Sequence, residues 1–324
     1  MGELPTFADV EQSFERIKSY INHTPVMTSR TLNSLIEANI FLKCENFQRI
    51  GAFKPRGALN KILQLTEEEK KRGIITHSSG NHAQAVALAG KLLGIKTVVV
   101  MPENAPEVKV NATKCYGAEV IRCDNNTESR VQTVQELSKK YGYTLVHAYD
   151  DYKIITGAGT AAYEFLKEVG ELDFIFFPIG GGGLASGTII ASKGMIPNIE
   201  IIGVEPEEAN DAFRSIRDDK IYPSPYPNTI ADGLRTQLSE KTFRVIKKYN
   251  TKIITVYEKE IIDAMKFLWE RMKIVVEPSG AVSLAGIFKH KKFLKGKNVG
   301  AILSGGNVDL NDFFKSYYDR VSKN

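Results

Sequence analysis

Short apolar and β-branched runs alternate with stretches of helical spacing through the middle of the chain. Several of the runs are continuously apolar, which is typical of strands covered on both faces of a parallel sheet. We therefore predict a small α/β domain over residues 73–147. Its expected strands are 74–76, 97–101, 119–123 and 144–147, and its expected helices are 81–93, a segment after Pro106, and 127–141.

The same succession of strands and helices resumes near residue 174 and continues to residue 303. We predict that residues 1–72 and 148–324 form a larger α/β domain into which the small domain is inserted. In such open sheets, ligands bind beyond the carboxyl ends of the strands. The expected strands of the larger domain are 174–179, 200–204, 252–256 and 299–303, and its expected helices are 184–193, 259–272 and 279–293.

The segment 210–239 differs from its surroundings, because it is polar and contains Pro223, Pro225 and Pro227. This composition predicts a long irregular excursion, and long loops in compact domains are often functional.

The composition, 43% hydrophobic and 25% charged residues, fits a globular protein. The length of 324 residues is enough for two domains. The net charge of +5 is too small to indicate nucleic acid as a partner, and the basic run 289–297 is typical of a solvated helix end. No apolar run approaches the ~20 residues of a membrane span.

Nothing in the first 16 residues resembles the apolar core of a signal peptide. The three cysteines, Cys44, Cys115 and Cys123, lack CxxC spacing and do not indicate a metal site. An odd number of cysteines without a secretory signal is typical of reduced thiols. We therefore expect a cytoplasmic protein with no membrane partner.

The heptapeptide GAFKPRG, residues 51–57, places Lys54 between an aromatic residue and a proline. A lysine removed from water has a lowered pKa, and its neutral amine can form a Schiff base with an aldehyde. Lys54 is thus a candidate covalent anchor, while the alternative is a solvated loop lysine.

The motif SSGNH, residues 78–82, follows an expected strand and begins an expected helix. Backbone N–H groups at a helix N-terminus bind anions, so Ser79 and Asn81 are candidate ligands of a substrate carboxylate. Simple N-capping by the same residue types is the alternative.

Four consecutive glycines, Gly180 to Gly183, precede a helix that is expected to begin with Leu184. Glycine amides at a helix N-terminus can close around a phosphate. The alternative is a dinucleotide-binding turn, in which Glu205 would bind a ribose. A last motif, SGGN at 304–307, also follows an expected strand, where the Ser304 hydroxyl could face a ring nitrogen or belong to an ordinary turn.

Taken together and in this order, the motifs resemble the fold-type II pyridoxal phosphate (PLP) enzymes, specifically the serine racemase and serine/threonine dehydratase family. ADG at 231–233 and VEPSG at 276–280 add to the resemblance, which covers nearly the whole chain. It implies a tryptophan synthase β-like α/β fold, with a parallel-sheet large domain and a smaller inserted domain. It also implies a homodimer that acts on a small amino acid.

The resemblance implies a role for each cofactor-binding motif. Lys54 matches the lysine that forms the Schiff base with PLP, and Ser304 would face the pyridine nitrogen. A neutral serine leaves that nitrogen largely unprotonated, which disfavours transamination. The remaining implied contacts are Phe53 behind the ring, Asn81 on the ring hydroxyl, and Gly180, Gly181, Gly182, Gly183 and Leu184 around the phosphate.

Racemisation needs a proton donor on each face of a planar carbanion, and Lys54 and Ser79 match the two that the family uses. The same site can expel the β-hydroxyl of serine, which yields pyruvate and ammonia. The implied substrate contacts are Ser78, Ser79, Asn81, His82, Arg130 and Thr236.

Two further sites are implied outside the reaction centre. Glu205, the carbonyl of Ala209 and Asp211 resemble a divalent-cation site, and such oxygen ligands suit Mg²⁺, Ca²⁺ or Mn²⁺. An ordinary acidic loop is the alternative. The racemases also bind ATP between subunits as an effector, and the matching positions here are Gln84, Tyr116, Lys273 and Asn307.

The implied function is a serine racemase with serine ammonia-lyase activity. The alternatives are a catabolic L-threonine/L-serine dehydratase with little racemase activity and a non-catalytic PLP-binding protein. One departure from the family is Ala52, which stands where many relatives have serine or threonine and removes a hydroxyl beside Lys54.

Overall fold

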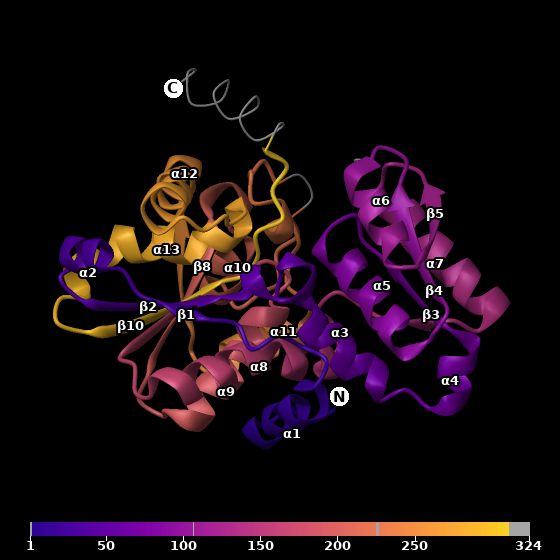
Figure 1. Cartoon of the computed structure of the whole chain (residues 1–324), viewed down its shortest axis with the longest axis horizontal. Coiled ribbons are helices and arrows are strands. Elements are labelled where there is room, and N and C mark those ends of the chain that lie inside the picture. The colour runs from indigo at the N-terminus through magenta and orange to yellow at the C-terminus, as the bar shows by residue number, and fades with distance from the viewer. Residues whose placement is uncertain (1, 106, 225–226, 311–324) are drawn as a thin grey trace.

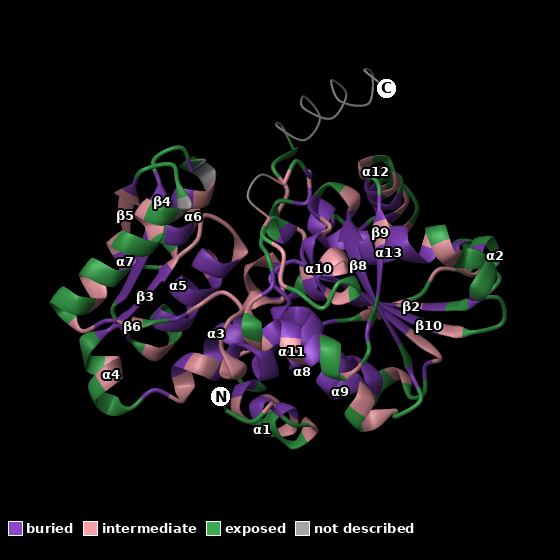
Figure 2. Cartoon of the chain, turned by 180° about the vertical axis from the view of Figure 1, so that it is seen from behind, coloured by how far each residue is buried: buried purple, intermediate pink, exposed green. Residues whose placement is uncertain are grey.

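Two separate β-sheets organise the molecule, and helices cover both of them (Figure 1). The structure is a computed structural model that describes residues 2–105, 107–224 and 227–310. Strands and inner helices are buried, while the outer faces of the peripheral helices are exposed (Figure 2).

The larger sheet has six strands in the order β1-β2-β10-β7-β8-β9. Every neighbouring pair is parallel except β1 and β2, which are antiparallel. The carboxyl ends of the parallel strands therefore meet along one edge. The strands are β1 (Val26–Met27), β2 (Asn39–Cys44), β7 (Phe174–Pro178), β8 (Glu200–Pro206), β9 (Lys252–Val256) and β10 (Asn298–Leu303).

Helices pack on both faces of this sheet and form two apolar cores. One core joins the sheet to α2 (Arg30–Ile36), α12 (Glu258–Phe267) and α13 (Pro278–His290). The other joins it to α1 (Phe7–Ile17), α8 (Tyr152–Val169), α9 (Gly183–Met195) and α11 (Glu240–Lys248). Helices α8 and α9 cross closely where both have glycine. A Cβ at Gly187 would lie only 2.4 Å from the backbone nitrogen of Gly159.

The smaller sheet has four parallel strands in the order β5-β4-β3-β6. Helices α5 and α6 pack on one face and α7 on the other. Its strands are β3 (Ile74–His77), β4 (Thr97–Pro102), β5 (Glu119–Cys123) and β6 (Thr144–Leu145), and its helices are α5 (Asn81–Leu93), α6 (Glu107–Cys115) and α7 (Thr127–Tyr141).

Helix α3 (Lys54–Leu63) joins the two sheets, because its apolar side packs against α5 in a shared core. The short helix α4 (Glu67–Arg72) then leads into β3. All strands of the smaller sheet thus lie between residues 74 and 145, inside the predicted insertion. The division of the chain into domains at 73 and 147 stays a prediction.

Most elements expected from the hydrophobic pattern are present, and three details differ. The strand expected over 144–147 ends at Leu145, and the helix expected over 259–272 changes to a π-helical turn, Leu268–Met272. The excursion 210–239 is not wholly irregular, because it contains α10 (Asp211–Arg217). That helix begins where the buried Glu205 carboxylate accepts the backbone N–H groups of its first residues.

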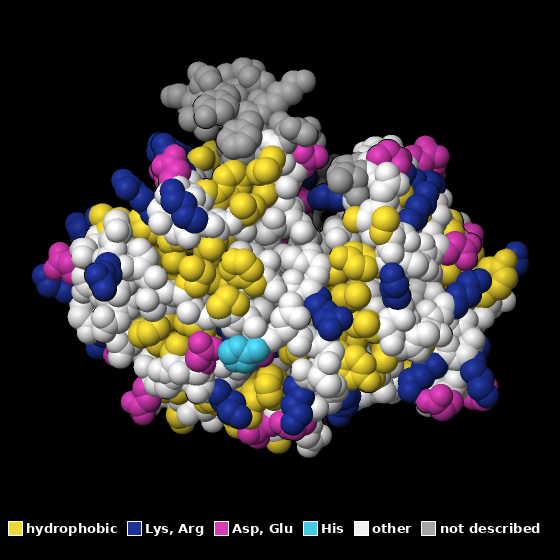
Figure 3. All heavy atoms as spheres, in the orientation of Figure 1, with side chains coloured by type: hydrophobic (Ala, Val, Ile, Leu, Met, Phe, Trp, Pro, Cys, Tyr) yellow, Lys and Arg dark blue, Asp and Glu magenta, His cyan; other side chains and the backbone are white. Residues whose placement is uncertain are grey.

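The surface is mixed in charge. Basic and acidic side chains are interspersed on the face shown in Figure 3, and the lysines of the run 289–297 are exposed at the end of α13, as predicted. Within the part of the chain that the structure describes, no helix is both long and apolar enough to cross a membrane.

Candidate active site

The motifs GAFKPRG and SGGN lie side by side at the carboxyl edge of the larger sheet. The N–H of Phe53 donates to the carbonyl of Ser304 over 3.1 Å, and the N–H of Gly306 donates to the carbonyl of Gly51 over 2.8 Å. Ala52 and Gly305 form an antiparallel bridge between them. These main-chain contacts place Lys54, the first residue of α3, next to the end of β10.

The amine of Lys54 is largely removed from water. Burial lowers its pKa from 10.5 to about 8, and the nearby Glu277 carboxylate opposes the shift. The Nζ atom donates to the Ala148 carbonyl over 3.2 Å and lies 4.9 Å from the centre of the Phe53 ring. A neutral amine is therefore accessible near physiological pH, which a reaction with an aldehyde requires.

Asn81 is held between the side chains of Glu277, which precedes α13, and Asn307, which follows β10. Its Nδ2 donates to Glu277 over 2.8 Å, and its Oδ1 accepts from Asn307 Nδ2 over 2.8 Å. The Asn307 amide also donates to the Ile50 carbonyl over 2.6 Å. Both groups of Asn81 are thus fixed in orientation at the start of α5.

The four-glycine loop has no room for side chains. Gly182 has φ +85°, a left-handed conformation that favours glycine, and it caps α9. A Cβ at Gly180 would lie 2.9 Å from the Cα of Leu234 and 3.2 Å from Thr236 Oγ1. The loop therefore lies beside Thr236, with backbone N–H groups at the start of a 13-residue helix, the arrangement that binds phosphate elsewhere.

Ser304 is buried at the end of β10, and its Oγ donates to the Ser279 carbonyl over 3.4 Å. The hydroxyl is a neutral group, as the sequence indicated. Leu184 follows the glycine loop and is also buried.

The turn SSGNH connects β3 to α5. Ser78 Oγ accepts the N–H of Gly80 over 3.2 Å, and Ser79 is half-buried beside it. Three residues after Ser79, the His82 ring lies near enough to Lys54 for the lysine charge to act on it. Burial, and then that charge, lowers the His82 pKa to about 3. His82 is thus neutral, and its Nε2 lies 2.9 Å from the Val146 carbonyl, to which it donates as the neutral N–H tautomer.

Arg130 lies in the first turn of α7, which packs on the smaller sheet, and its Nε donates to the Asn126 carbonyl over 3.4 Å. Its charge also acts on His77, whose pKa falls to about 4 because of burial, the His147 ring and then Arg130. The structure thus places Arg130 near the carboxyl end of β3.

Two buried carboxylates lie together, Glu205 near the end of β8 and Asp211 at the start of α10. Burial, and then repulsion from Asp211, raises the pKa of Glu205 well above its usual value. Burial also raises the pKa of Asp211 to about 6, although Ser224 and the main chain near Leu238 oppose this. Neither Asp211 oxygen makes a hydrogen bond of good geometry within the described residues.

Such a pair suits a hard cation, which would neutralise both charges. Ala209, in the short helix Glu207–Ala209 between them, is buried. Among the residues described, no cluster of three or more His, Cys, Asp or Glu side chains forms a metal site, so a cation here would rely on the two carboxylates, a carbonyl and water.

The four positions matched to a nucleotide site are not joined to one another by any hydrogen bond or ion pair in the described structure. Gln84 lies on α5, and Tyr116 packs on the core of the smaller sheet. Lys273 is exposed and donates to the Glu270 carbonyl over 2.6 Å. Asn307 instead orients Asn81, a role that the sequence did not suggest.

Two residues of the site were missed from sequence. Glu277 lies in the motif VEPSG, which indicated no role for it, yet it is buried against Asn81 and its pKa is raised by burial and by Asp232. Tyr149 lies in no recognised motif, yet its ring contacts the glycine loop. Only the tertiary structure brings these residues to the site.

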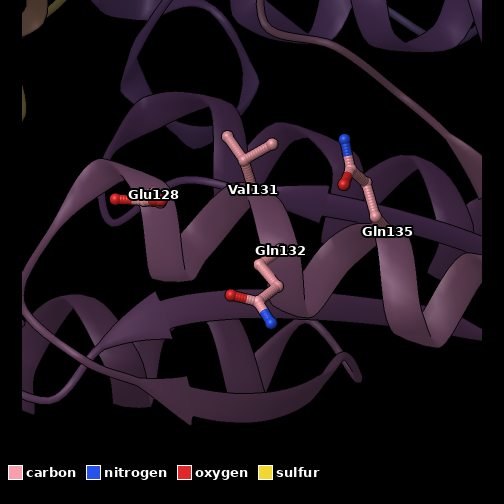
Figure 4. A pocket seen from close by; sticks show the side chains of 4 residues that line it. All are labelled: Glu128, Val131, Gln132 and Gln135. Atoms are coloured by element: carbon pink, nitrogen blue, oxygen red, sulfur yellow. The ribbon is translucent and has the colours of Figure 1, made fainter.

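A shallow depression on α7 is lined by Glu128, Val131, Gln132 and Gln135, which point away from one another (Figure 4). It contains no nucleophile and no converging polar groups, so we assign no function to it.

A family model described as pyridoxal-phosphate dependent enzyme matches residues 17–305. The chain belongs to this family. A serine racemase of Schizosaccharomyces pombe is 50% identical over 308 residues, which are 95% of both chains. An L-threo-3-hydroxyaspartate ammonia-lyase of Saccharomyces cerevisiae is 49% identical over 308 residues, covering 95% of this chain and 94% of that relative.

The solved structures agree with the family. Serine racemase from Dictyostelium discoideum superposes with a TM-score of 0.90 at 46% identity, over 94% of this chain and 99% of that one. Maize serine racemase superposes with a TM-score of 0.93 at 40% identity, over 99% of both chains. The predicted fold-type II class is confirmed, and the chain is a PLP-dependent enzyme.

The residues present fit PLP. The desolvated lysine can react with an aldehyde. The glycine loop, which has no room for a Cβ, can hold a phosphate with its backbone N–H groups. The buried neutral hydroxyl of Ser304 can face a ring nitrogen. The dinucleotide alternative fits less well, because both oxygens of Glu205 accept backbone N–H groups and the side chain is fully buried. It therefore cannot reach a ribose.

Proposed function

We propose that this enzyme is a serine racemase that also converts serine to pyruvate and ammonia, by β-elimination of water followed by hydrolysis that takes up one water. The observation that supports this most directly is that Lys54 lies near the SSGNH turn. The Lys54 amine has a pKa of about 8, and its charge lowers the pKa of His82 in that turn. Five racemases between 43% and 50% identical to this chain extend the argument to the substrate.

When bound, PLP supplies the electron-withdrawing system that acidifies the α-hydrogen of an amino acid. The chain supplies the proton transfers. The Lys54 amine removes or returns the α-proton on one face of the substrate, and the Ser79 hydroxyl does so on the other. Asn81, Ser78 and the N-terminus of α5 would orient the substrate carboxylate, with Arg130 and Thr236 at the margins of the site.

The cofactor contacts follow from the same geometry. Gly180, Gly181, Gly182, Gly183 and Leu184 would hold the phosphate with backbone N–H groups, and Phe53 would lie against the ring. Asn81 would meet the ring hydroxyl, and Ser304 the ring nitrogen. A neutral partner for that nitrogen favours proton transfer and β-elimination over transamination.

The second candidate is an ammonia-lyase that acts on a 3-hydroxy amino acid and racemises little. The observation in its favour is the 49% identity to a hydroxyaspartate ammonia-lyase, since this nearly equals the identity to the racemase. Loss of a β-hydroxyl requires the same α-proton removal by Lys54, so the two candidates differ in whether Ser79 returns a proton.

We also propose the divalent cation and the assembly that the resemblance implied. Glu205, the Ala209 carbonyl and Asp211 would hold Mg²⁺, Ca²⁺ or Mn²⁺, supported by the unsatisfied oxygens of Asp211. Gln84, Tyr116, Lys273 and Asn307 would contact ATP as an effector in a cytoplasmic homodimer. That assembly is testable by measuring mass in solution with and without ATP.

One assay decides between the two candidates. Purified enzyme is incubated with L-serine and, separately, with L-threo-3-hydroxyaspartate, and D-serine, pyruvate and oxaloacetate are measured together. A racemase forms D-serine as a main product. Formation of keto acids alone, with no D-serine, contradicts the racemase proposal and supports the lyase.

A further inference from the structure

The segment 147–151 leads from β6 to α8 and passes both the lysine and the glycine loop. Its Ala148 carbonyl accepts from Lys54 over 3.2 Å. Asp150 pairs with Lys241 over 3.1 Å, and Asp151 pairs with Lys61 over 2.7 Å while its side chain caps α8. These contacts fix the segment between the anchor of the cofactor and the loop that would hold its phosphate.

The central side chain of this segment, Tyr149, lies directly against the glycine loop. A Cβ at Gly181 would lie between 2.4 and 2.6 Å from three atoms of the Tyr149 ring, and a Cβ at Gly183 would lie 2.9 Å from its Cβ. A side chain added at either glycine would therefore collide with the tyrosine unless one of them moved.

The orientation of Tyr149 is itself fixed. Its ring meets His147 edge-on at 4.8 Å and 80°. The N–H groups of Tyr149 and Asp150 both donate to His147 Nδ1, over 3.2 and 2.9 Å. Burial, and then the charges of Asp150 and Asp211, raises the phenol pKa to about 12. The phenol thus stays neutral and adds no negative charge beside the loop.

The glycine loop 180–183 needs neighbouring side chains to hold its shape. Glycine loses more conformational freedom on folding than any other residue, so a run of four glycines is costly to hold in one shape. A phosphate site needs several backbone N–H groups fixed at once. The loop is held on its other side by Leu234 and, at Gly182, by Thr242, whose Cβ would lie 2.6 Å from an added Cβ.

We propose that Tyr149 is a positioning residue for the cofactor phosphate, whose ring holds the glycine loop 180–183 in its anion-binding shape. This inference rests on the proposed role of the loop and does not depend on which amino acid the enzyme converts.

The test compares two cofactor forms that differ only in the phosphate. Apoenzyme is titrated with PLP and with pyridoxal, and each dissociation constant is measured by absorbance and fluorescence. Tyr149→Ala should weaken PLP binding by up to about 10²-fold, as small misplacements of a preorganised site do, and leave pyridoxal binding unchanged. Tyr149→Phe should bind both as wild type does, because the ring and not the hydroxyl makes the contact.

Tyr141→Ala, an exposed tyrosine on α7, is the matched control. Equal weakening of both ligands, or of neither, overturns the proposal.

A double-substitution cycle tests the contact from the side of the loop, and its single variant Gly181→Ala keeps the proposal testable if Tyr149→Ala folds poorly. Gly181→Ala alone should weaken PLP binding because its Cβ meets the ring, whereas in the Tyr149→Ala background the same change should cost little. Additive effects contradict the proposed contact. The failure of the loop assignment looks different, because Gly181→Ala would then leave PLP binding intact in both backgrounds.

Discussion

The Lys54 amine is the single group on which the chemistry of this site depends, and its protonation sets a testable pH dependence. Burial disfavours its charged form, while Glu277 partly restores it. Below its pKa the amine is protonated and cannot attack the PLP aldehyde, and above it the amine is free to react. The rate at which apoenzyme attaches PLP should therefore rise with pH through about 8 and level off above it.

Stopped-flow absorbance after mixing apoenzyme with PLP measures this rate, and Lys54→Ala provides the baseline with no covalent attachment. Borohydride reduction and peptide mapping should place the label on Lys54. A midpoint near the ordinary value of 10.5 would show that the amine is solvated, contrary to the structure.

Ser79 is the second residue whose role can be isolated. Ser79→Ala removes the proton donor on one face and leaves Lys54 and the glycine loop intact. Loss of one positioned acid or base costs ~10²–10⁴-fold, and this loss should fall on racemisation in both directions. Elimination should persist from the serine enantiomer whose α-hydrogen faces Lys54 and fail from the other.

The measurements for Ser79→Ala are D-serine and pyruvate formation from each enantiomer, with the visible absorbance of bound PLP as the check on folding. Ser34→Ala, which removes an exposed hydroxyl on α2 away from the site, is the matched control. Near-wild-type racemisation by Ser79→Ala would mean that another group serves the second face.

Single residues also show where sequence reasoning reaches its limit. Lys54 was predictable because its neighbours in the chain form a recognisable motif. Glu277 was not, because its role depends on Asn81, which lies 196 positions away in sequence. The same limit applies to Tyr149, whose partners Gly181 and Gly183 belong to another element.

At the scale of elements, helices with clear ends were predicted closely. Helix α7 begins after Asn126, whose side chain accepts the N–H of Ser129, and it ends at Gly142 in the left-handed conformation. Strand β2 was not predicted. It contains Lys43, which is fully buried and pairs with Glu164 over 2.7 Å. A buried charge is costly unless it is paired, and the partner, 121 positions away, is not visible in the local pattern.

The β8–α10 connection leads to a prediction about metal removal. Glu205 and Asp211 are buried and repel each other, so a bound cation should stabilise this connection beside the glycine loop. EDTA should lower the melting temperature and the activity together, and Mg²⁺ should restore both, because a ligand that binds only the folded state stabilises it.

Asp211→Ala should abolish the response to EDTA and Mg²⁺. Glu208→Ala, an exposed acid in the same loop, should respond as wild type does. If both variants respond alike, the cation binds elsewhere or the connection is an acidic loop without a metal.

Across the whole molecule, the site is assembled from both sheets, and polar contacts bridge them. Asn81 on α5 bonds to Glu277 and Asn307, which belong to the larger sheet and its helices. Lys109 on α6 pairs with Asp232 over 2.8 Å, in the short helix Asp232–Leu234. The charges of Asp232 and Lys109 both act on Glu277, so this ion pair lies near the site.

The pair of Lys109 and Asp232 should therefore act on substrate affinity and not on the stability of either sheet. Both side chains are partly exposed, at 27% and 45%, so the pair is worth about 1 kcal/mol or less, or roughly fivefold in affinity. Lys109→Met should raise the KM for L-serine by up to about that factor while the melting temperature changes little. A higher salt concentration should raise the KM of the wild type toward that of the variant, since salt screens exposed charges. Lys96→Met, which removes a more exposed pair with Glu119 within the smaller sheet, should leave the KM unchanged. An equal effect of both substitutions would show that general surface charge, and not the bridge between the sheets, governs substrate binding.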